Sequence, residues 1–399
     1  GFILAAAGSA VGLGNIWKFP GKAYEGGGGA YILIYLAIVL LIGIPVMLSE
    51  LTIGRGAQAN AIDSYGKLGH PGYKWVGWFG VIVAFIITSY YCHVGGWVLR
   101  YVASYATEPT KVYADPLGYF YALLGYNAVT GETWFPLTAV IFAGIFMGIT
   151  CFIIVKGVES GIERFNKIGM PALFVILIIL LIRALTMPGA GEGLQYMLIP
   201  DWSKVTFSTV LSALGQAFFS LSLGMAIMVT YGSYVKKEEN LAKNAAIICG
   251  MDTLVALIAG FIIVPAVFAT LGSEGVGKGA GFAFSSLAGV FQQMPGGQFF
   301  GILFYMLLLF AALRAGKVLN FISTPVMGGF ISGICCTIIL MQVPKLMGHA
   351  AGTGELLELV ERILVAGQSV HWLSLGLGVA ALAILLLAKR FLPKFPMAI

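Results

Sequence analysis

The sequence predicts an all-α, polytopic membrane protein, and three observations lead to this prediction. Of its 399 residues 59% are hydrophobic and only 10% are charged, whereas roughly 25% are charged in an ordinary soluble domain. Apolar runs long enough to cross a bilayer recur along the chain. The 54 glycines follow no collagen-like period and lie within apolar runs, as glycines of transmembrane helices do. These features exclude a soluble globular protein.

Ten segments are apolar over the length, about 20 residues, that a helix needs to span a membrane. They are residues 1–21, 29–53, 77–104, 134–155, 168–187, 207–234, 243–271, 297–313, 317–342 and 371–391. If the first span runs outward, nine lysines and arginines fall in inner loops and five at outer positions, which predicts a cytoplasmic N-terminus. Residues 105–133 and 272–296 are expected to form structured outer loops.

Composition also excludes several classes of partner. The five cysteines lack C-x-x-C spacing, so neither a disulfide framework nor a zinc site is expected. The net charge of +6 comes largely from the inner loops, so the expected partner is the lipid bilayer and no nucleic acid. The first residue, Gly1, already stands in a hydrophobic stretch without an initiator Met. We therefore expect the chain to be a fragment at its N-terminus.

Two spans contain helix-breaking residues near mid-membrane. Residues 8–15 read GSAVGLGN and residues 218–225 read FFSLSLGM. Glycine weakens helices and serine competes for backbone hydrogen bonds, so both segments can unwind and expose polar backbone groups that lipid does not satisfy. Broken spans at positions one and six indicate a five-plus-five inverted repeat with a substrate site at the midplane. The alternative is that the small residues only allow close helix packing.

Long motifs in the first 313 residues resemble the neurotransmitter:sodium symporter family. They are GSAVGLGNIWKFP at 8–20, the Gly-rich 25–30, GIP at 43–45 with Glu50 and Gly54-Arg55, Tyr90-Tyr91, GVESGIE at 157–163, GQAFFSLSLG at 215–224 and TYGSY at 230–234. The resemblance implies a LeuT-like inverted-repeat fold with broken spans 1 and 6. It also implies sodium-coupled symport of a small neutral amino acid across the plasma (inner) membrane, and no enzymatic activity.

The same resemblance implies the site residues. The positions that match a first sodium site are Ala10, Asn15, Ser220 and Asp252. Those that match carbonyl ligands of a second, incomplete sodium site are Gly8, Val11 and Ala311. The substrate-binding positions are Ala10, Leu13, Gly14, Ile87, Tyr91, Phe219, Ser220, Ser222 and Met225. The outer gate positions are Lys18, Tyr91 and Phe219.

Within this set, the amides of Leu13 and Gly14 and the Tyr91 hydroxyl are implied to bind the substrate carboxylate, which matches the anion affinity of helix ends. The apolar side chains of Ile87, Phe219 and Met225, which are implied to line the pocket, predict a substrate with a hydrophobic or aromatic side chain. Plain alternatives exist. In the alternative interpretation, the hydroxyls of Ser220 and Ser222 bond to backbone carbonyls one turn earlier. Tyr91 and Phe219 are then ordinary packing residues.

Three positions depart from the family or invite two interpretations. Asp252 stands where many members have Asn. Insertion of a carboxylate into a membrane span costs about 2.5–3.5 kcal/mol, which marks Asp252 as a functional candidate. Its charge is expected to replace the negative charge that chloride supplies in chloride-dependent members, so transport without chloride is expected. Lys18 replaces the gate Arg and lacks its bidentate fork, and no acidic partner for it is identified. Glu50 is expected either to accept a hydrogen bond near the end of the second span or to reach interfacial water.

After Leu313 the symporter pattern ends. Arg314 and Lys317 occur where the family would supply hydroxyl ligands of the second sodium. Residues 318–333, 342–348 and 389–396 instead resemble a SulP-type sulfate permease, and no polar linker separates the two parts. We therefore expect a chimeric chain, with residues 1–313 carrying symporter spans 1–8 and residues 314–399 a SulP-like fragment. An artificial junction is the leading explanation. Because the chain lacks the equivalent of the family's ninth and tenth spans and half a sodium site, an intact hybrid without activity is one alternative.

Two other functions compete with amino-acid symport. One is anion (sulfate) transport of the SulP type, with the symporter segment as the foreign part. The other is a membrane-embedded hydrolase, which needs a paired catalytic set within the membrane. Asp252 has no evident carboxylate partner in the sequence, which disfavours the hydrolase.

Overall fold

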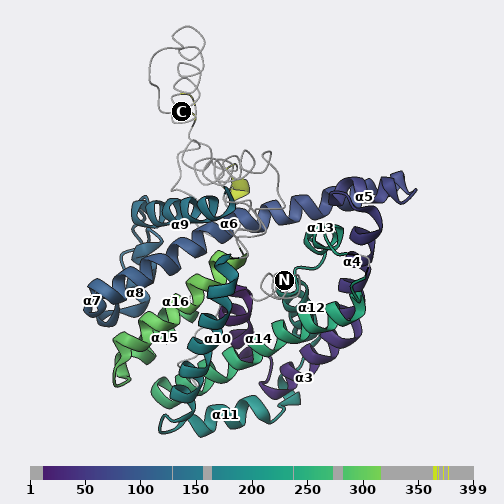
Figure 1. The fold of residues 1–399 in the computed structure, drawn as a ribbon. Helices are drawn as coiled ribbons and strands as arrows, with labels where there is room; N and C mark the ends of the chain where they lie inside the picture. The colour runs from purple at the N-terminus through teal and green to yellow at the C-terminus, as the bar shows by residue number, and fades with distance from the viewer. Residues whose placement is uncertain are drawn as a thin grey trace. The chain divides into compact units, whose positions relative to one another are not determined.

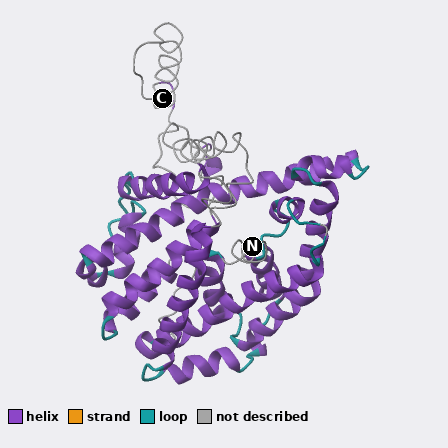
Figure 2. Ribbon diagram, in the orientation of Figure 1, coloured by secondary structure: helices purple, strands orange, loops and turns teal. Residues whose placement is uncertain are grey.

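The computed structural model describes residues 12–127, 129–155, 164–236, 238–272 and 282–315, together with 363–365, 367, 372 and 376. The chain divides into two compact units, Gly1–Ser323 and Thr324–Ile399. In the second unit the few described residues are helical. All named elements belong to the first unit, and in its described part they are helices without a strand (Figures 1 and 2). The predicted all-α class is confirmed.

The elements of the first half, which contain the expected spans one to four, are listed here with their bounds. They are η1 (Gly14–Lys18), α2 (Phe19–Glu25), α3 (Gly29–Ile38), η2 (Val39–Gly43), α4 (Ile44–Ala57), α5 (Ala61–Lys67), η3 (Pro71–Tyr73), α6 (Lys74–Thr107), α7 (Pro109–Ala114), α8 (Pro116–Leu123) and α9 (Leu137–Val155). The stretches η1 and η2 are π-helical turns, a feature that often occurs at functional sites.

The second half continues with the later spans. Its elements are α10 (Arg164–Leu185), α11 (Ala190–Leu198), η5 (Trp202–Lys204), α12 (Phe207–Ser220), α13 (Ile227–Ser233), α14 (Leu241–Leu271), α15 (Phe282–Gln293) and α16 (Gly297–Ala315). The expected outer loops thus hold short helices, α7 and α8 in one and α15 in the other. The expected spans at 317–342 and 371–391 lie outside the described residues, apart from Trp372 and Gly376.

Three described helical stretches are long and apolar enough to cross a membrane on their own, namely Gly29–Ala57, Pro71–Thr107 and Leu241–Leu271. The pair Pro171–Leu185 and Ala190–Leu198 passes the same test together but is bent by 111°. Shorter apolar helices cover Leu137–Phe152, Phe207–Ser220 and Gly297–Leu313. All of these except Ala190–Leu198 overlap a segment that hydropathy selected.

Local sequence explains where several helices begin. The side chain of Thr206 accepts a hydrogen bond from the Thr209 amide and completes a capping box at the start of α12, which satisfies an otherwise free helix donor. Asn240 caps α14 in the same way through the amide of Lys243. These caps fix the start of the two helices that carry Ser220 and Asp252.

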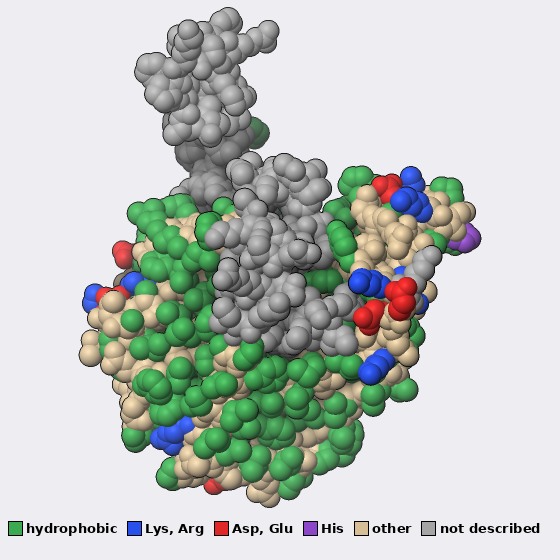
Figure 3. All heavy atoms as spheres, viewed as in Figure 1, with side chains coloured by type: hydrophobic (Ala, Val, Ile, Leu, Met, Phe, Trp, Pro, Cys, Tyr) green, Lys and Arg blue, Asp and Glu red, His purple; other side chains and the backbone are tan. Residues whose placement is uncertain are grey.

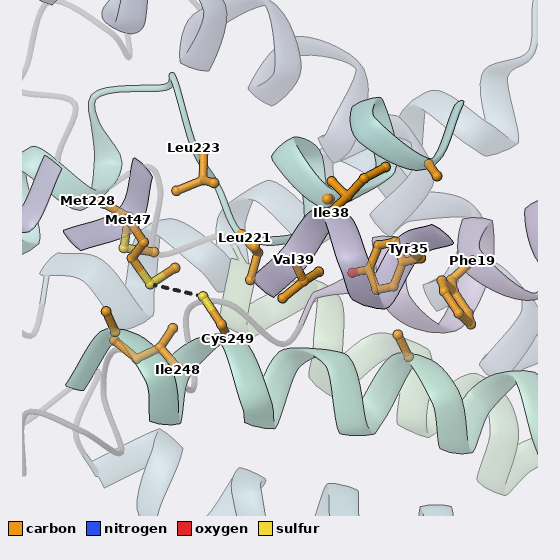
Figure 4. Packing of buried hydrophobic residues seen from close by; sticks show 14 of the residues in the cluster. Phe19, Tyr35, Ile38, Val39, Met47, Leu221, Leu223, Met228, Ile248 and Cys249 are labelled. Atoms are coloured by element: carbon orange, nitrogen blue, oxygen red, sulfur yellow. Dashed lines mark hydrogen bonds between the residues drawn. The ribbon is translucent and has the colours of Figure 1, made fainter. Parts of the chain in front are cut away.

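The buried core joins α3, α4, α12, α13 and α14 (Figure 4). In it, the Cys249 thiol donates a hydrogen bond to Met47 Sδ at 3.6 Å. Helices α4 and α13 pack closely because glycines lie at their crossing: a Cβ at Gly54 would lie 1.8 Å from the Val229 carbonyl oxygen and 2.9 Å from Gly232 Cα. The second half of the sixth span is therefore fixed against the second span.

Large apolar side chains cover much of the outside. Leu41 is 76% exposed and Ile182 is 58% exposed. On the face in Figure 3, hydrophobic side chains spread broadly while charged ones gather toward the edges. Trp75 and Trp78 are also exposed at the start of α6, as expected for aromatic side chains at a membrane interface.

Candidate functional site

The break predicted in the sixth span is present. Helix α12 ends at Ser220 and α13 begins at Ile227. Between them Ser222 and Ala226 have φ of 57° and 60°, in the left-handed region that non-glycine residues rarely occupy. The amide of Gly224 in this segment donates to Glu50 Oε1 at 2.7 Å. Of the two roles considered for Glu50, the structure shows the hydrogen-bonding one, and it connects the second span to the break.

The described part of the first span begins at the end of its predicted break. Gly14 opens the π-helical turn η1, and its carbonyl accepts from the Phe19 amide and from Gln216 Nε2 at 3.1 Å. A Cβ on Gly14 would lie 2.8 Å from the Phe219 ring, so only glycine fits beside α12 here. Residues Gly8, Ala10 and Val11 lie outside the described residues.

Three polar residues from three distant helices meet beside this turn. Asn15 Nδ2 donates to the carbonyl oxygen of Asp252 at 2.8 Å and to its Oδ1 at 2.7 Å. Ser220 Oγ lies 2.6 Å from Asn15 Oδ1 and 2.7 Å from Asp252 Oδ2. Asn15 and Asp252 are 0% exposed and Ser220 is 4% exposed. The structure thus brings together the described members of the implied first sodium site.

The hydrogen count of this cluster matters chemically. Both amide hydrogens of Asn15 are used on Asp252, and Ser220 has a single hydroxyl hydrogen for two acceptors. When Asp252 is ionised, one acceptor oxygen is therefore left without a hydrogen. No lysine or arginine in the described part of the chain pairs with the buried carboxylate of Asp252. Such an anionic, oxygen-rich cluster suits a hard cation.

Two residues near the cluster were not selected from the sequence. The Tyr35 hydroxyl is buried next to Ser220 and Asp252 without a well-formed hydrogen bond among the described residues. Gln216 binds the Gly14 carbonyl. The available signal was a polar atom in an apolar span, but a tyrosine or glutamine there commonly serves packing alone.

Of the implied substrate positions, Phe219, Tyr91 and Ser220 lie beside the same turn. Leu13 is 1% exposed, and Ser222 and Met225 are 8% exposed, while Ile87 and Phe219 are half-buried against the core. The buried hydroxyl of Tyr91 lies beside the Leu13 backbone and forms no well-formed hydrogen bond within the described part. A buried donor of this kind needs an acceptor.

Two of the implied gate residues, Lys18 and Phe219, contact each other. The Lys18 ammonium lies 4.4 Å from the centre of the Phe219 ring and 5.5 Å from that of Tyr90. Both distances fall within the range of a cation–π interaction. Lys18 thus meets aromatic faces at the position where the family has an arginine.

The implied second sodium site is only partly described. Ala311 is buried on α16, whereas Gly8 and Val11 lie outside the described residues, as does the side chain of Arg314. No group of three or more His, Cys, Asp or Glu side chains in the described part is arranged to hold a metal. A transition-metal site is therefore not among the described features.

A polar contact fixes the C-terminal end of α2, which continues the first span. The Tyr196 hydroxyl donates to the Tyr24 carbonyl at 2.7 Å, and Lys204 Nζ donates to the Tyr196 hydroxyl at 3.2 Å. This bond raises the pKa of Lys204. The hydroxyl of Ser203 is the main cause of a lowered pKa of Asp201, whose amide donates to the Gly27 carbonyl.

Known proteins match this chain over most of its length. The profile of the Sodium:neurotransmitter symporter family matches residues 1–111 and 123–341, and that of the Sulfate permease family matches residues 297–398. The "uncharacterized sodium-dependent transporter YhdH" of Bacillus subtilis is 41% identical over 79% of this chain and 68% of its own. A Haemophilus influenzae sodium-dependent transporter is 39% identical over 78% and 69%.

A solved structure shares the fold. The crystal structure of MhsT in complex with L-phenylalanine has a TM-score of 0.73 and 38% identity, over 91% of this chain and 79% of that one. The predicted LeuT-like architecture is confirmed, and family and fold are those of membrane transporters rather than enzymes. The chain belongs to the sodium:neurotransmitter symporter family of sodium-dependent transporters.

Proposed function

We propose that this chain couples inward sodium movement to uptake of a small neutral amino acid with a hydrophobic or aromatic side chain. The observation that carries the proposal is the fully buried carboxylate of Asp252, whose hydrogen-bond partners among the described residues are Asn15 and Ser220. A buried charge without a counter-charge is costly. A sodium ion bound by Asn15, Ser220, Asp252 and the carbonyl of Ala10 supplies the counter-charge.

Coupling follows from sharing this ion with the substrate. If the sodium contacts the substrate carboxylate, each strengthens the binding of the other by the same factor. Entry of one positive charge gains about 2.3 kcal/mol per 100 mV of membrane potential. A second sodium, bound by the carbonyls of Gly8, Val11 and Ala311, would add to this driving force if the missing ligands of this site were supplied.

The substrate site uses the freed backbone of the first span. The amides of Leu13 and Gly14 and the Tyr91 hydroxyl bind the carboxylate, and Ser222 lies in the wall of the pocket. Ile87, Phe219 and Met225 form an apolar surface for the side chain. The solved relative MhsT holds L-phenylalanine, which supports a hydrophobic or aromatic substrate. Lys18, Tyr91 and Phe219 close the outer side.

The proposal includes independence from chloride, because the Asp252 carboxylate already provides the negative charge beside the sodium. It also places the protein in the plasma (inner) membrane as a multi-pass protein with a cytoplasmic N-terminus, on the excess of lysine and arginine in the inner loops.

The C-terminal part carries a separate proposal. We infer that residues 314–399 derive from a SulP-type permease joined to a symporter, with the sulfate permease match at 297–398 as support; the symporter match overlaps it to residue 341. Single long reads of the source DNA across codons 290–340 test the junction. Reads that differ from this sequence after Leu313 identify an artificial junction, and reads that match it across the whole region identify a natural hybrid.

The transport proposal is tested with the full chain in proteoliposomes whose interior is sodium-free. An inward sodium gradient should drive uptake of labelled L-phenylalanine or L-leucine, in chloride or in gluconate, and a potassium gradient should not. Sulfate uptake that ignores sodium would favour the SulP-type function, which the match at 297–398 makes the second candidate. Uptake of neither solute would show that the intact chain is inactive.

A further inference from the structure

We propose that Gln216 is a positioning residue that fixes the Gly14–Asn15 peptide, and through it the sodium ligand Asn15, without touching ion or substrate. This inference rests on the proposed sodium site. The Gln216 side chain is 6% exposed, and its Nε2 donates to the Gly14 carbonyl at 3.1 Å across the two broken spans.

The Gly14 carbonyl has two separate partners. In the π-helical turn η1 it accepts from the Phe19 amide, and its second lone pair accepts from Gln216. A carbonyl bound on both sides holds its peptide plane in one orientation. The other end of that plane is the Asn15 amide, which donates to the Gly12 carbonyl at 3.3 Å.

Three residues on one face of α12 contact this turn. Gln216, Phe219 and Ser220 are spaced i, i+3 and i+4, so they lie on the same side of the helix. Gln216 binds the Gly14 carbonyl. Phe219 fills the space beside the Gly14 Cα, and Ser220 reaches Asn15 Oδ1 at 2.6 Å.

The consequence is a division of roles along this face. Ser220 contacts the ion, whereas Gln216 sets the backbone from which Asn15 projects. Rotation of the peptide plane would displace the Asn15 side chain from Asp252, where both of its amide hydrogens are used. Loss of the Gln216 donor should therefore weaken sodium binding more than it weakens the fold.

The test compares Gln216→Met and Gln216→Glu with Gln298→Met in the full chain. Gln298 is a matched control, because its Nε2 also donates to a backbone carbonyl of another helix, Tyr105, at 3.0 Å. The measurement is the sodium concentration that gives half the sodium-induced rise in melting temperature, without amino acid. A parallel sodium titration of labelled L-phenylalanine binding reports on the substrate site.

Gln216→Met should raise the half-saturating sodium concentration about tenfold, the change expected for one lost hydrogen bond. Gln216→Glu should raise it further, because a carboxylate would face the carbonyl. Gln298→Met should lower the melting temperature and leave the sodium requirement unchanged. A Gln216→Met variant that is less stable but has the wild-type sodium requirement would overturn the proposal and assign a purely structural role.

The two proposals fail in different ways. A wild-type chain that responds to sodium but binds no phenylalanine overturns the proposed substrate, and the sodium titration of the Gln216 variants still decides the positioning role. A wild-type chain without any response to sodium overturns the sodium site and the positioning role together.

Discussion

The side-chain Nδ2 of Asn15 lies 2.7 Å from Oδ1 of Asp252, although the two residues are 237 positions apart in the sequence. The contact joins the first span to the middle of α14, and Ser220 adds the sixth span to it. The proposed coupling of sodium to transport depends on the negative charge of Asp252.

Removal of that charge should change ion dependence. Asp252→Asn keeps the shape and one oxygen but is neutral, so the sodium is no longer balanced by the protein. We expect transport either to stop or to require chloride, measured as amino-acid uptake in chloride and in gluconate. Unchanged, chloride-independent uptake by the variant would contradict this role.

Glu50 should stabilise the break in the sixth span. Glu50→Met removes the acceptor of the Gly224 amide, and the loss of such a hydrogen bond costs about 0.5–1.5 kcal/mol of unfolding free energy. Glu50→Gln retains an acceptor oxygen and should cost less. Thermal unfolding of the two variants makes the comparison, and equal losses would show that the hydrogen bond is unimportant.

The crossing of α4 and α13 should tolerate no side chain at Gly54. Gly54→Ala places a Cβ 1.8 Å from the Val229 carbonyl oxygen, and overpacking of this kind costs about 1–3 kcal/mol or more. Gly144→Ala is the control, because no atom lies within 4 Å of its Cβ; it should stabilise the chain by about 0.5–1 kcal/mol. Melting temperatures that fall equally would refute the crossing.

The hydrogen bonds that the Asp201 carboxylate accepts from Ser203 should weaken in acid. The pKa of Asp201 is lowered in the folded chain, first by the Ser203 hydroxyl. The ionised form therefore stabilises the fold above the unfolded pKa of about 3.9, and this contribution is lost as pH falls through the lowered folded value.

Asp201→Asn should accordingly lower the melting temperature slightly at pH 7, since the group is exposed. The gap between variant and wild type should close as the pH falls below the range in which Asp201 ionises. A gap that widens on acidification would show that the lowered pKa does not stabilise this contact.

Much of the architecture follows from hydropathy and helix-breaking residues. The described spans fall where apolar runs predict them, and the break after Ser220 follows from the serines and glycine of residues 220–224. The left-handed conformations of Ser222 and Ala226 could not be predicted, because non-glycine residues adopt them only where surrounding contacts impose them.

Site residues could be predicted where a charged side chain stands in an apolar span or a family motif is present. Asp252 stands out as a carboxylate in an apolar span, and family resemblance adds Asn15 and Ser220. Gln216 and Tyr35 were missed, because their relevance depends on which backbone or carboxylate they face, and this is set by packing between distant helices. The glycine crossing at Gly54 likewise depends on contacts that no local pattern encodes.

Equilibrium binding of radioactive sodium to the purified full chain tests the central claim most directly. The wild-type chain should bind sodium, and Asp252→Ala should bind less per molecule, while Asp201→Asn, at the start of η5, should bind as much as wild type. Equal sodium binding by the wild type and Asp252→Ala would contradict a sodium site at Asn15, Ser220 and Asp252.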